Sequence, residues 1–174
     1  LYMMNLVFRK DYSGISAFLN NVFASGIVER ERKVSVAGRL VTDTLYVRDN
    51  WESLAASLII LESKYPDDEE ILSLRPVMLE IAERNDDAIA RYEELIADGR
   101  PGFYFREKLL ILYMEKKEYS KVFDLAADYS RQNNRSLLGK IYYAMAAMEL
   151  KEYLVADTEL KKAMILAGND DEVK

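Results

Sequence analysis

The chain has 174 residues, with 24 lysines and arginines against 30 aspartates and glutamates, and a formal net charge of −6. It contains no cysteine and no histidine, which excludes disulfides, thiolate and imidazole catalysis, and zinc or iron–sulfur sites that need those side chains. An acidic chain is also poorly suited to neutralising phosphates, so we expect no nucleic-acid partner.

The balance of residues is that of a folded, soluble protein. Half of the residues are hydrophobic and 31% are charged, which is typical of globular chains. The longest stretch without charge, residues 12–28, falls short of the ~20 apolar residues of a spanning helix, so we expect no membrane insertion. The first residues lack the order of a targeting segment. We expect a cytoplasmic or periplasmic protein, and the compartment stays open.

Residues 1–27 are predicted to form a partial helical repeat, mainly its second helix. Asp11–Ile15 resembles turn segments found later in the chain, and Ile15, Leu19 and Val22 have the spacing of one buried helix face. Residues 28–34 are predicted to be a linker insertion. A chain that begins partway through a repeat indicates a fragment of a longer protein.

Four later segments share one register. Lys117–Val122 recurs as Lys151–Ala156, which is an offset of 151 − 117 = 34. Steps of 34 give four anchors, each followed by apolar residues four and seven positions later: Leu54, Ala88, Val122 and Ala156. Second helices are predicted over residues 51–64, 86–97, 119–131 and 153–167, because proline, glycine or asparagine follows each one. This period predicts helical repeats over 35–68, 69–102, 103–136 and 137–168, and a polar tail over 169–174.

The repeats resemble the tetratricopeptide repeat (TPR) family, whose unit is an antiparallel helix pair of about 34 residues. The resemblance covers residues 35–168 and rests on the following matches: Leu109 with Tyr113, Ala144, Ala88 with Tyr92, Ala156 with Leu160, Pro66, and the turn aromatics Trp51, Tyr119 and Tyr153. The glycines of the family are replaced, by Leu110 or Pro76 in the first helix and by Lys117 or Lys151 in the turn. The resemblance implies an all-α fold, a right-handed α-solenoid of antiparallel helix pairs.

Pro76 conflicts with a helix over residues 69–83, because proline inside a helix costs about 3 kcal/mol. Either the helix continues with a kink, or a new helix begins at Pro76. We prefer the continuous helix, since apolar residues keep helical spacing on both sides of Pro76.

Acidic clusters are the only candidates for catalytic or metal chemistry. Asp67–Glu70 and Asp86–Asp87 lie where helices are predicted to begin, and carboxylates at that position cap free N–H groups. Asp170–Asp171 lies in the predicted tail. None has the spacing of a calcium loop, and nucleotide-binding and nucleophile motifs are absent. We expect no catalytic residue, metal or cofactor.

In the family that the repeats resemble, side chains of the first helices line a concave face that binds peptides or partner helices. The resemblance places these residues on that face: Arg39, Asp43, Tyr46, Glu70, Ser73, Val77, Glu80, Tyr104, Glu107, Lys108, Ile111, Met114, Glu115, Leu138, Ile141, Tyr142, Met145, Met148 and Glu149. Acids outnumber bases among them, so the face suits an apolar partner that carries lysine or arginine. Some of these residues could equally be core, above all Ile141, Tyr142 and Met145.

The leading hypothesis is a non-enzymatic scaffold that binds another protein on this face. Self-association through terminal repeats is an alternative, because no further amphipathic helix is predicted to cover the last pair, and either more chain or a second subunit would do so. A further alternative is the interaction domain of a larger enzyme or receptor. An enzyme that uses only carboxylates, lysine or tyrosine, and an RNA-binding repeat, rank lower.

Overall fold

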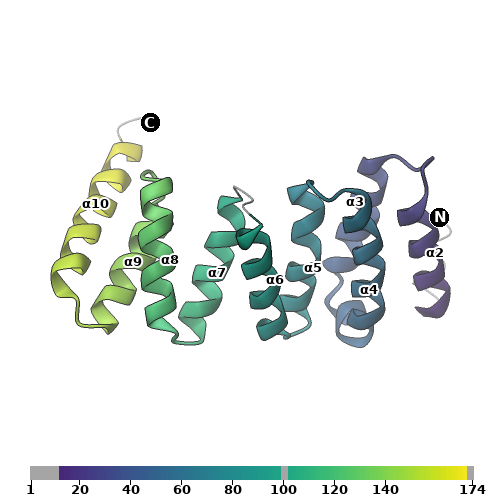
Figure 1. Ribbon diagram of the computed structural model, residues 1–174, viewed down its shortest axis with the longest axis horizontal. Helices are drawn as coiled ribbons and strands as arrows, with labels where there is room; N and C mark the ends of the chain where they lie inside the picture. Colours follow the sequence, from purple (N-terminus) through teal and green to yellow (C-terminus); the bar gives the residue numbers. More distant parts are fainter. Residues whose placement is uncertain (1–11, 99–101, 172–174) are drawn as a thin grey trace. The chain divides into compact units, whose positions relative to one another are not determined.

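The structure is a computed structural model that describes residues 12–98 and 102–171 (Figure 1). Within these ranges it consists of helices joined by turns and loops, without a strand. The helices are α2 (Tyr12–Ala24), α3 (Arg30–Val41), α4 (Thr44–Lys64), α5 (Glu69–Ile81), α6 (Asn85–Ala97), α7 (Phe103–Glu115), α8 (Tyr119–Gln132), α9 (Leu137–Glu149) and α10 (Tyr153–Asp171). The all-α fold of successive helix pairs is therefore confirmed. No helix within the described ranges combines the length and the apolar character needed to span a membrane.

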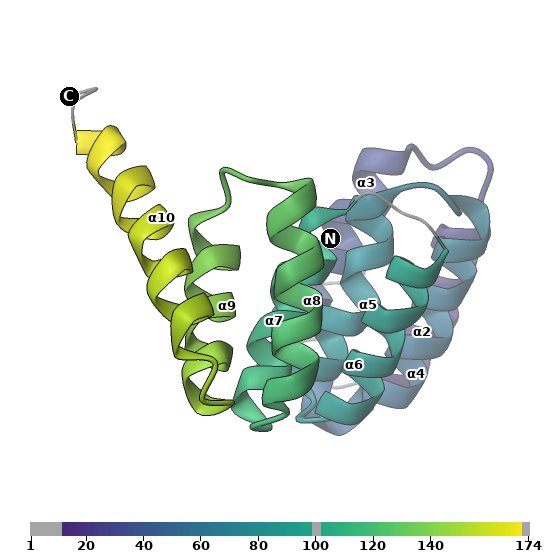
Figure 2. The same ribbon diagram turned by 60° about the vertical axis from the view of Figure 1, so that its left-hand side comes forward.

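The helices form two compact units that divide inside α6, between Arg91 and Tyr92. In the first unit α4 packs against α2, α3 and α5, and α3 also contacts α5 (Figure 2). Its core contains fully buried apolar side chains from α2 and α4: Ile15, Leu19, Phe23, Leu54, Leu58 and Leu61. Phe23 takes the buried position predicted for Val22, which is half-buried, because residues 15, 19 and 23 lie in one row of a helix.

In the second unit α9 packs against α8 and α10 and also contacts α7, which packs against α8. The predicted anchors Val122 and Ala156 are buried, as are Ala126 and Tyr129. Phe123 of α8 and Tyr143 of α9 meet edge to face, with ring centroids 4.9 Å apart. α8 therefore buries the face that the sequence predicts, whereas α10 buries Ala156 and Ala163 and leaves Leu160 exposed.

The first predicted pair differs from the other pairs. α3 begins at Arg30, inside the segment predicted as a linker, and it ends at Val41. The Asp43 carboxylate then accepts a hydrogen bond from the Tyr46 N–H at 3.0 Å and starts α4. A short helical segment follows as far as Asn50, whose φ of −137° interrupts the helix before residue 51. Tyr46 therefore belongs to α4 and Asp43 is the cap of α4. Neither residue belongs to the first helix of the pair.

Helix α5 runs without a break through Pro76, as the preferred prediction has it. The prediction for the end of the chain was less accurate. α10 continues through Gly168 to Asp171, so Gly168 does not end the helix and the tail does not begin at residue 169. Glycine inside a helix costs only about 1 kcal/mol relative to alanine.

Three first helices end in the same tight turn, at Glu83, Lys117 and Lys151. These residues lie at intervals of 34 and have a positive φ, between 59° and 65°. In each turn the next N–H donates back to a carbonyl in the last turn of the helix, at 2.8–2.9 Å: Arg84 to Leu79, Glu118 to Tyr113 and Glu152 to Ala147. This is the Schellman arrangement, which glycine favours because a Cβ is strained in the left-handed region.

Replacing Lys117 by glycine is expected to raise the free energy of unfolding by about 0.5–1 kcal/mol. Relief of left-handed strain, about 1–2 kcal/mol, exceeds the added entropy of the unfolded chain, about 0.4–1 kcal/mol. Thermal unfolding should then show a midpoint increase of roughly 1–4 °C. Lys117→Ala is the matched control, since it removes the side chain and keeps the Cβ. An equal gain from Lys117→Ala would show that the left-handed backbone is not the cause.

Candidate functional site

The structure places all the predicted partner-binding residues except Tyr46 at the surface, exposed or half-buried. Tyr46 is only 4% exposed and belongs to the core of the first unit. The prediction for Tyr46 is therefore wrong, because the chain starts a new helix at Thr44 and turns this side chain inward.

Two predicted acids of the first unit have partners within the chain. Asp43 caps α4, and the Glu70 carboxylate accepts a hydrogen bond from the Arg30 guanidinium at 2.7 Å. Arg30 also forms two bonds to Asp68, at 2.5 and 2.9 Å. These bonds hold the pKa of Asp68 below its usual value, and they tie the start of α3 to the start of α5. Arg30 was not predicted, because nothing in its local sequence indicates a partner on another helix.

Arg39 of α3 and Ser73, Val77 and Glu80 of α5 also lie at the surface of the first unit. The predicted residues of the second unit lie on two helices that contact each other, α7 and α9. We call this surface the α7–α9 face, and it consists of Tyr104, Lys108, Ile111, Met114, Glu115, Leu138, Ile141, Tyr142, Met145, Met148 and Glu149. Apolar side chains dominate it. Tyr104 is 43% exposed, Met145 44% and Met148 54%. Ile141 is also exposed and Tyr142 is half-buried. The alternative that Ile141, Tyr142 and Met145 are core residues is therefore not observed, because none of the three is fully buried.

Glu107 also lies on α7, but its carboxylate is bonded to a residue of α8. Its carboxylate accepts a hydrogen bond from the Tyr129 hydroxyl at 2.5 Å, which links α7 to α8. Burial and this bond to a carboxylate raise the pKa of Tyr129. Glu107 therefore holds two helices together, and we leave it out of the α7–α9 face.

Two exposed acids set the charge of the α7–α9 face. Glu115 and Glu149 occupy the last positions of α7 and α9, which are equivalent positions of successive repeats, and both are exposed. Lys108 is the basic residue of the α7–α9 face. The face thus combines a floor of tyrosine, isoleucine and methionine with two carboxylates at the same end of both helices.

Buried charge clusters between the helices were not predicted from the sequence. In the first unit the Glu62 carboxylate of α4 accepts bonds from Arg75 of α5, at 2.9 Å, and from Arg91 of α6, at 3.0 Å. Glu62 is buried, and both of its oxygens are satisfied. The cluster is stabilising only while it is complete, because a single buried charge without its partners is costly.

The described residues include no group of three or more aspartates and glutamates placed to hold a metal. The acids that the sequence analysis considered as metal ligands lie at the starts of helices instead. The Asp68 carboxylate accepts the Ile71 N–H at 3.2 Å as the cap of α5, and Asp86 and Asp87 lie in the first turn of α6. The predicted capping role is confirmed for Asp68, and the predicted position in the first turn is confirmed for Asp86 and Asp87.

No protein-family model and no curated protein matches this chain. Solved structures of MamA are similar in fold. One, described as MamA MSR-1 C2, is 14% identical, with a TM-score of 0.58 over 97% of this chain and 94% of the MamA chain. A second, of a point mutant of MamA, is also 14% identical, with a TM-score of 0.56 over 95% and 93% of the two chains. At this identity the likeness shows the fold alone: this chain has the helical-repeat fold of MamA.

Proposed function

We propose that the protein is a non-enzymatic, TPR-like scaffold and that the α7–α9 face binds an apolar segment of a partner protein that carries lysine or arginine. The observation that carries this proposal is the row of exposed apolar side chains along α9, namely Ile141, Met145 and Met148. They recur at four and three residues, so they lie on one face of the helix. Water contact with this much apolar surface is unfavourable, and a partner would remove it.

The shape and chemistry of the side chains favour a peptide or a helix as the ligand. Methionine is flexible and polarisable and adapts to different apolar partners. Tyr104, at the start of α7, offers an aromatic ring together with a polar hydroxyl, as binding anchors often do. An extended peptide or an amphipathic helix would contact α7 and α9 together.

Glu115 and Glu149 favour a basic partner. Their carboxylates, at the ends of α7 and α9, would attract lysine or arginine of the ligand, which raises the association rate and selects against acidic peptides. Because both acids are exposed, this attraction should weaken with added salt.

Selection from a displayed library of random peptides tests the α7–α9 face. We expect the selected peptides to combine apolar residues with lysine or arginine, and the triple variant Tyr104→Ala, Met114→Ala, Met148→Ala to bind them at least about tenfold more weakly. Titration calorimetry or fluorescence anisotropy would measure the dissociation constants, and circular dichroism would check that helicity is kept.

The matched control is Ile27→Ala, Leu45→Ala, Ile59→Ala, which removes three exposed apolar side chains of the first unit. It should leave the dissociation constants unchanged. Selected peptides that are acidic, or that bind the α7–α9 variant as tightly as the original protein, would contradict the proposal.

Self-association is a second candidate function, favoured by the outer face of α10. Leu160 is 41% exposed, whereas its counterparts in the earlier repeats, Leu58, Tyr92 and Ala126, are almost completely buried. Tyr153 and Met164 lie on the same face and are exposed. A second copy of the chain would cover this apolar row.

Light scattering over a range of concentrations tests this second candidate. The expected result is an average mass that rises with concentration for the original protein and stays at the monomer value for Leu160→Glu, because a buried charge opposes an apolar contact. A monomer at every concentration in the original protein would rule out self-association through α10.

A further inference from the structure

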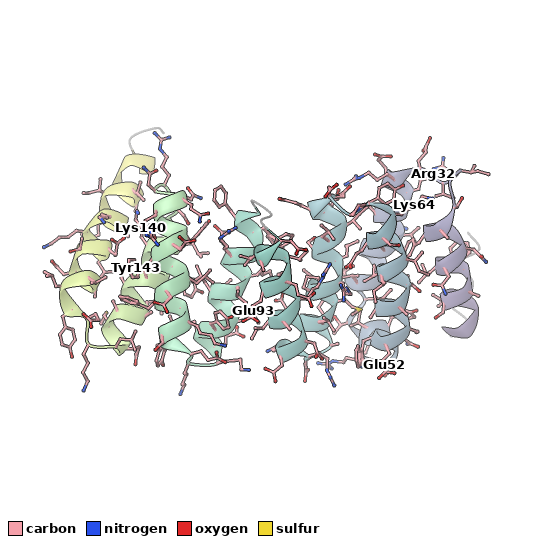
Figure 3. The ribbon with its side chains drawn as sticks, in the orientation of Figure 1. Arg32, Glu52, Lys64, Glu93, Lys140 and Tyr143 are labelled. Atoms are coloured by element: carbon pink, nitrogen blue, oxygen red, sulfur yellow. The ribbon has the colours of Figure 1, made fainter. Side chains whose placement is uncertain are left out.

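A surface cavity of about 330 Å³ lies in the second unit and uses none of the residues of the α7–α9 face. It is lined by Ser130 and Asn134 from α8 and the loop after it, Lys140 from α9, and Lys162, Ile165 and Leu166 from α10. Figure 3 shows Lys140 and Tyr143 on α9, the helix that packs against both α8 and α10. The volume is at the lower end of the range for small-molecule sites.

Lys140 is an unusual residue for its position. It is only 6% exposed, and its counterparts one and two repeats earlier are the buried Arg106 and Leu72. Lysine is rarely buried without a close partner. Among the described residues, the charge partner of the Lys140 ammonium is Glu159 of α10, whose Oε2 lies 4.0 Å from Nζ, beyond the length of a direct hydrogen bond.

Glu159 connects this ammonium to a second one. It is 5% exposed, and its Oε1 accepts a bond from the Lys162 ammonium at 2.7 Å. Its Oε2 is buried and has no hydrogen-bond partner among the described residues, and the same holds for the Ser130 hydroxyl. Burial and the negative charge of Glu159 raise the pKa of the neighbouring Tyr143. The polar groups of the cluster are therefore only partly satisfied by the chain.

The Glu62 carboxylate of the first unit is bonded differently from the Glu159 carboxylate. There, two arginines form direct bonds to both oxygens of one buried glutamate. In the second unit two lysines surround one glutamate, one of them at 4.0 Å, and the lysines line a cavity. Buried polar groups are almost always paired. The Lys140 ammonium, 4.0 Å from Glu159, and the Ser130 hydroxyl are the donors of the second cluster without a direct bond among the described residues, and they point to a ligand that accepts hydrogen bonds.

We infer that the cavity between α8, α9 and α10 binds the carboxylate of a small aliphatic acid or of a peptide C-terminus. The two lysines and Glu159 together carry one net positive charge, and one carboxylate would make the cluster neutral. The Lys140 ammonium, the Ser130 hydroxyl and the Asn134 amide supply donors for its oxygens. Ile165 and Leu166 supply an apolar wall for the aliphatic part of the ligand.

A titration of the full chain with 4-methylpentanoate, followed by the methyl NMR signals of Ile165 and Leu166, tests the inference. We expect saturable shifts with the acid and none with its carboxamide, which has the same shape without the charge. N-acetyl-leucyl-leucine and its carboxamide form the peptide arm. Tighter binding in one arm identifies the source of the carboxylate, and binding in either arm supports the site.

Variants of Lys140 separate binding from folding. Lys140→Met should weaken binding at least about tenfold, and it should keep the helical structure because Leu72 occupies the corresponding position. Lys140→Arg keeps the charge and should bind within a few-fold of the original protein. Lys161→Met is the matched control, since Lys161 is exposed and paired with Asp157 of the same helix.

Three results would overturn the inference. The carboxamides could shift the signals as the acids do, Lys140→Met could bind the acids as tightly as the original protein does, or inorganic phosphate could bind where both acids fail. A failure here leaves the proposal for the α7–α9 face intact, because the two sites share no residue.

Discussion

The structure depends on one constraint: an antiparallel helix pair can bury its apolar faces only against neighbouring helices. The anchor rows meet this constraint, because Leu54, Leu58 and Leu61 of α4 and Val122, Ala126 and Tyr129 of α8 are almost inaccessible to water. Truncating a buried aromatic such as Tyr129 would cost about 3–5 kcal/mol. Burial of these rows fixes how each helix is rotated about its axis, and that rotation decides which side chains of α7 and α9 remain at the surface. The proposed binding face follows from the packing of the core.

Tight turns preserve this rotation within each pair. Glu83, Lys117 and Lys151 adopt the left-handed backbone without the freedom of glycine, so each turn costs some stability. The cost is tolerated because the turn satisfies two helix carbonyls and returns the chain in a defined direction. The first pair lacks this turn. It has a helix break at Thr42–Asp43 and an irregular residue at Asn50 instead, and its predicted face is correspondingly altered, with Tyr46 buried.

The repeated helices and their buried anchors could be predicted from the sequence, because apolar spacing and stop residues act locally. Capping by Asp68 could be predicted for the same reason. The break between α3 and α4 could not be predicted, since an aspartate such as Asp43 fits either an exposed position within a helix or the cap of a new helix. The partners of Glu70 and Glu107 were also beyond prediction, because Arg30 and Tyr129 reach them from other helices. Lys140 was visible in the sequence as a single charged residue in the apolar first part of α9. Its burial could not be predicted, because it depends on the packing of α10.

The most direct test of the account is to determine which surface of the second unit a bound peptide contacts. Methionine methyl groups can be observed individually by NMR, and the described methionines lie in three environments: Met114, Met145 and Met148 on the α7–α9 face, Met164 on the outer face of α10, and Met78 in the core of the first unit. Addition of a selected basic, apolar peptide should shift the signals of Met114, Met145 and Met148 and leave those of Met164 and Met78 unchanged. Shifts confined to Met164 would contradict the account, because they would place the ligand on α10 and leave the α7–α9 face without a partner.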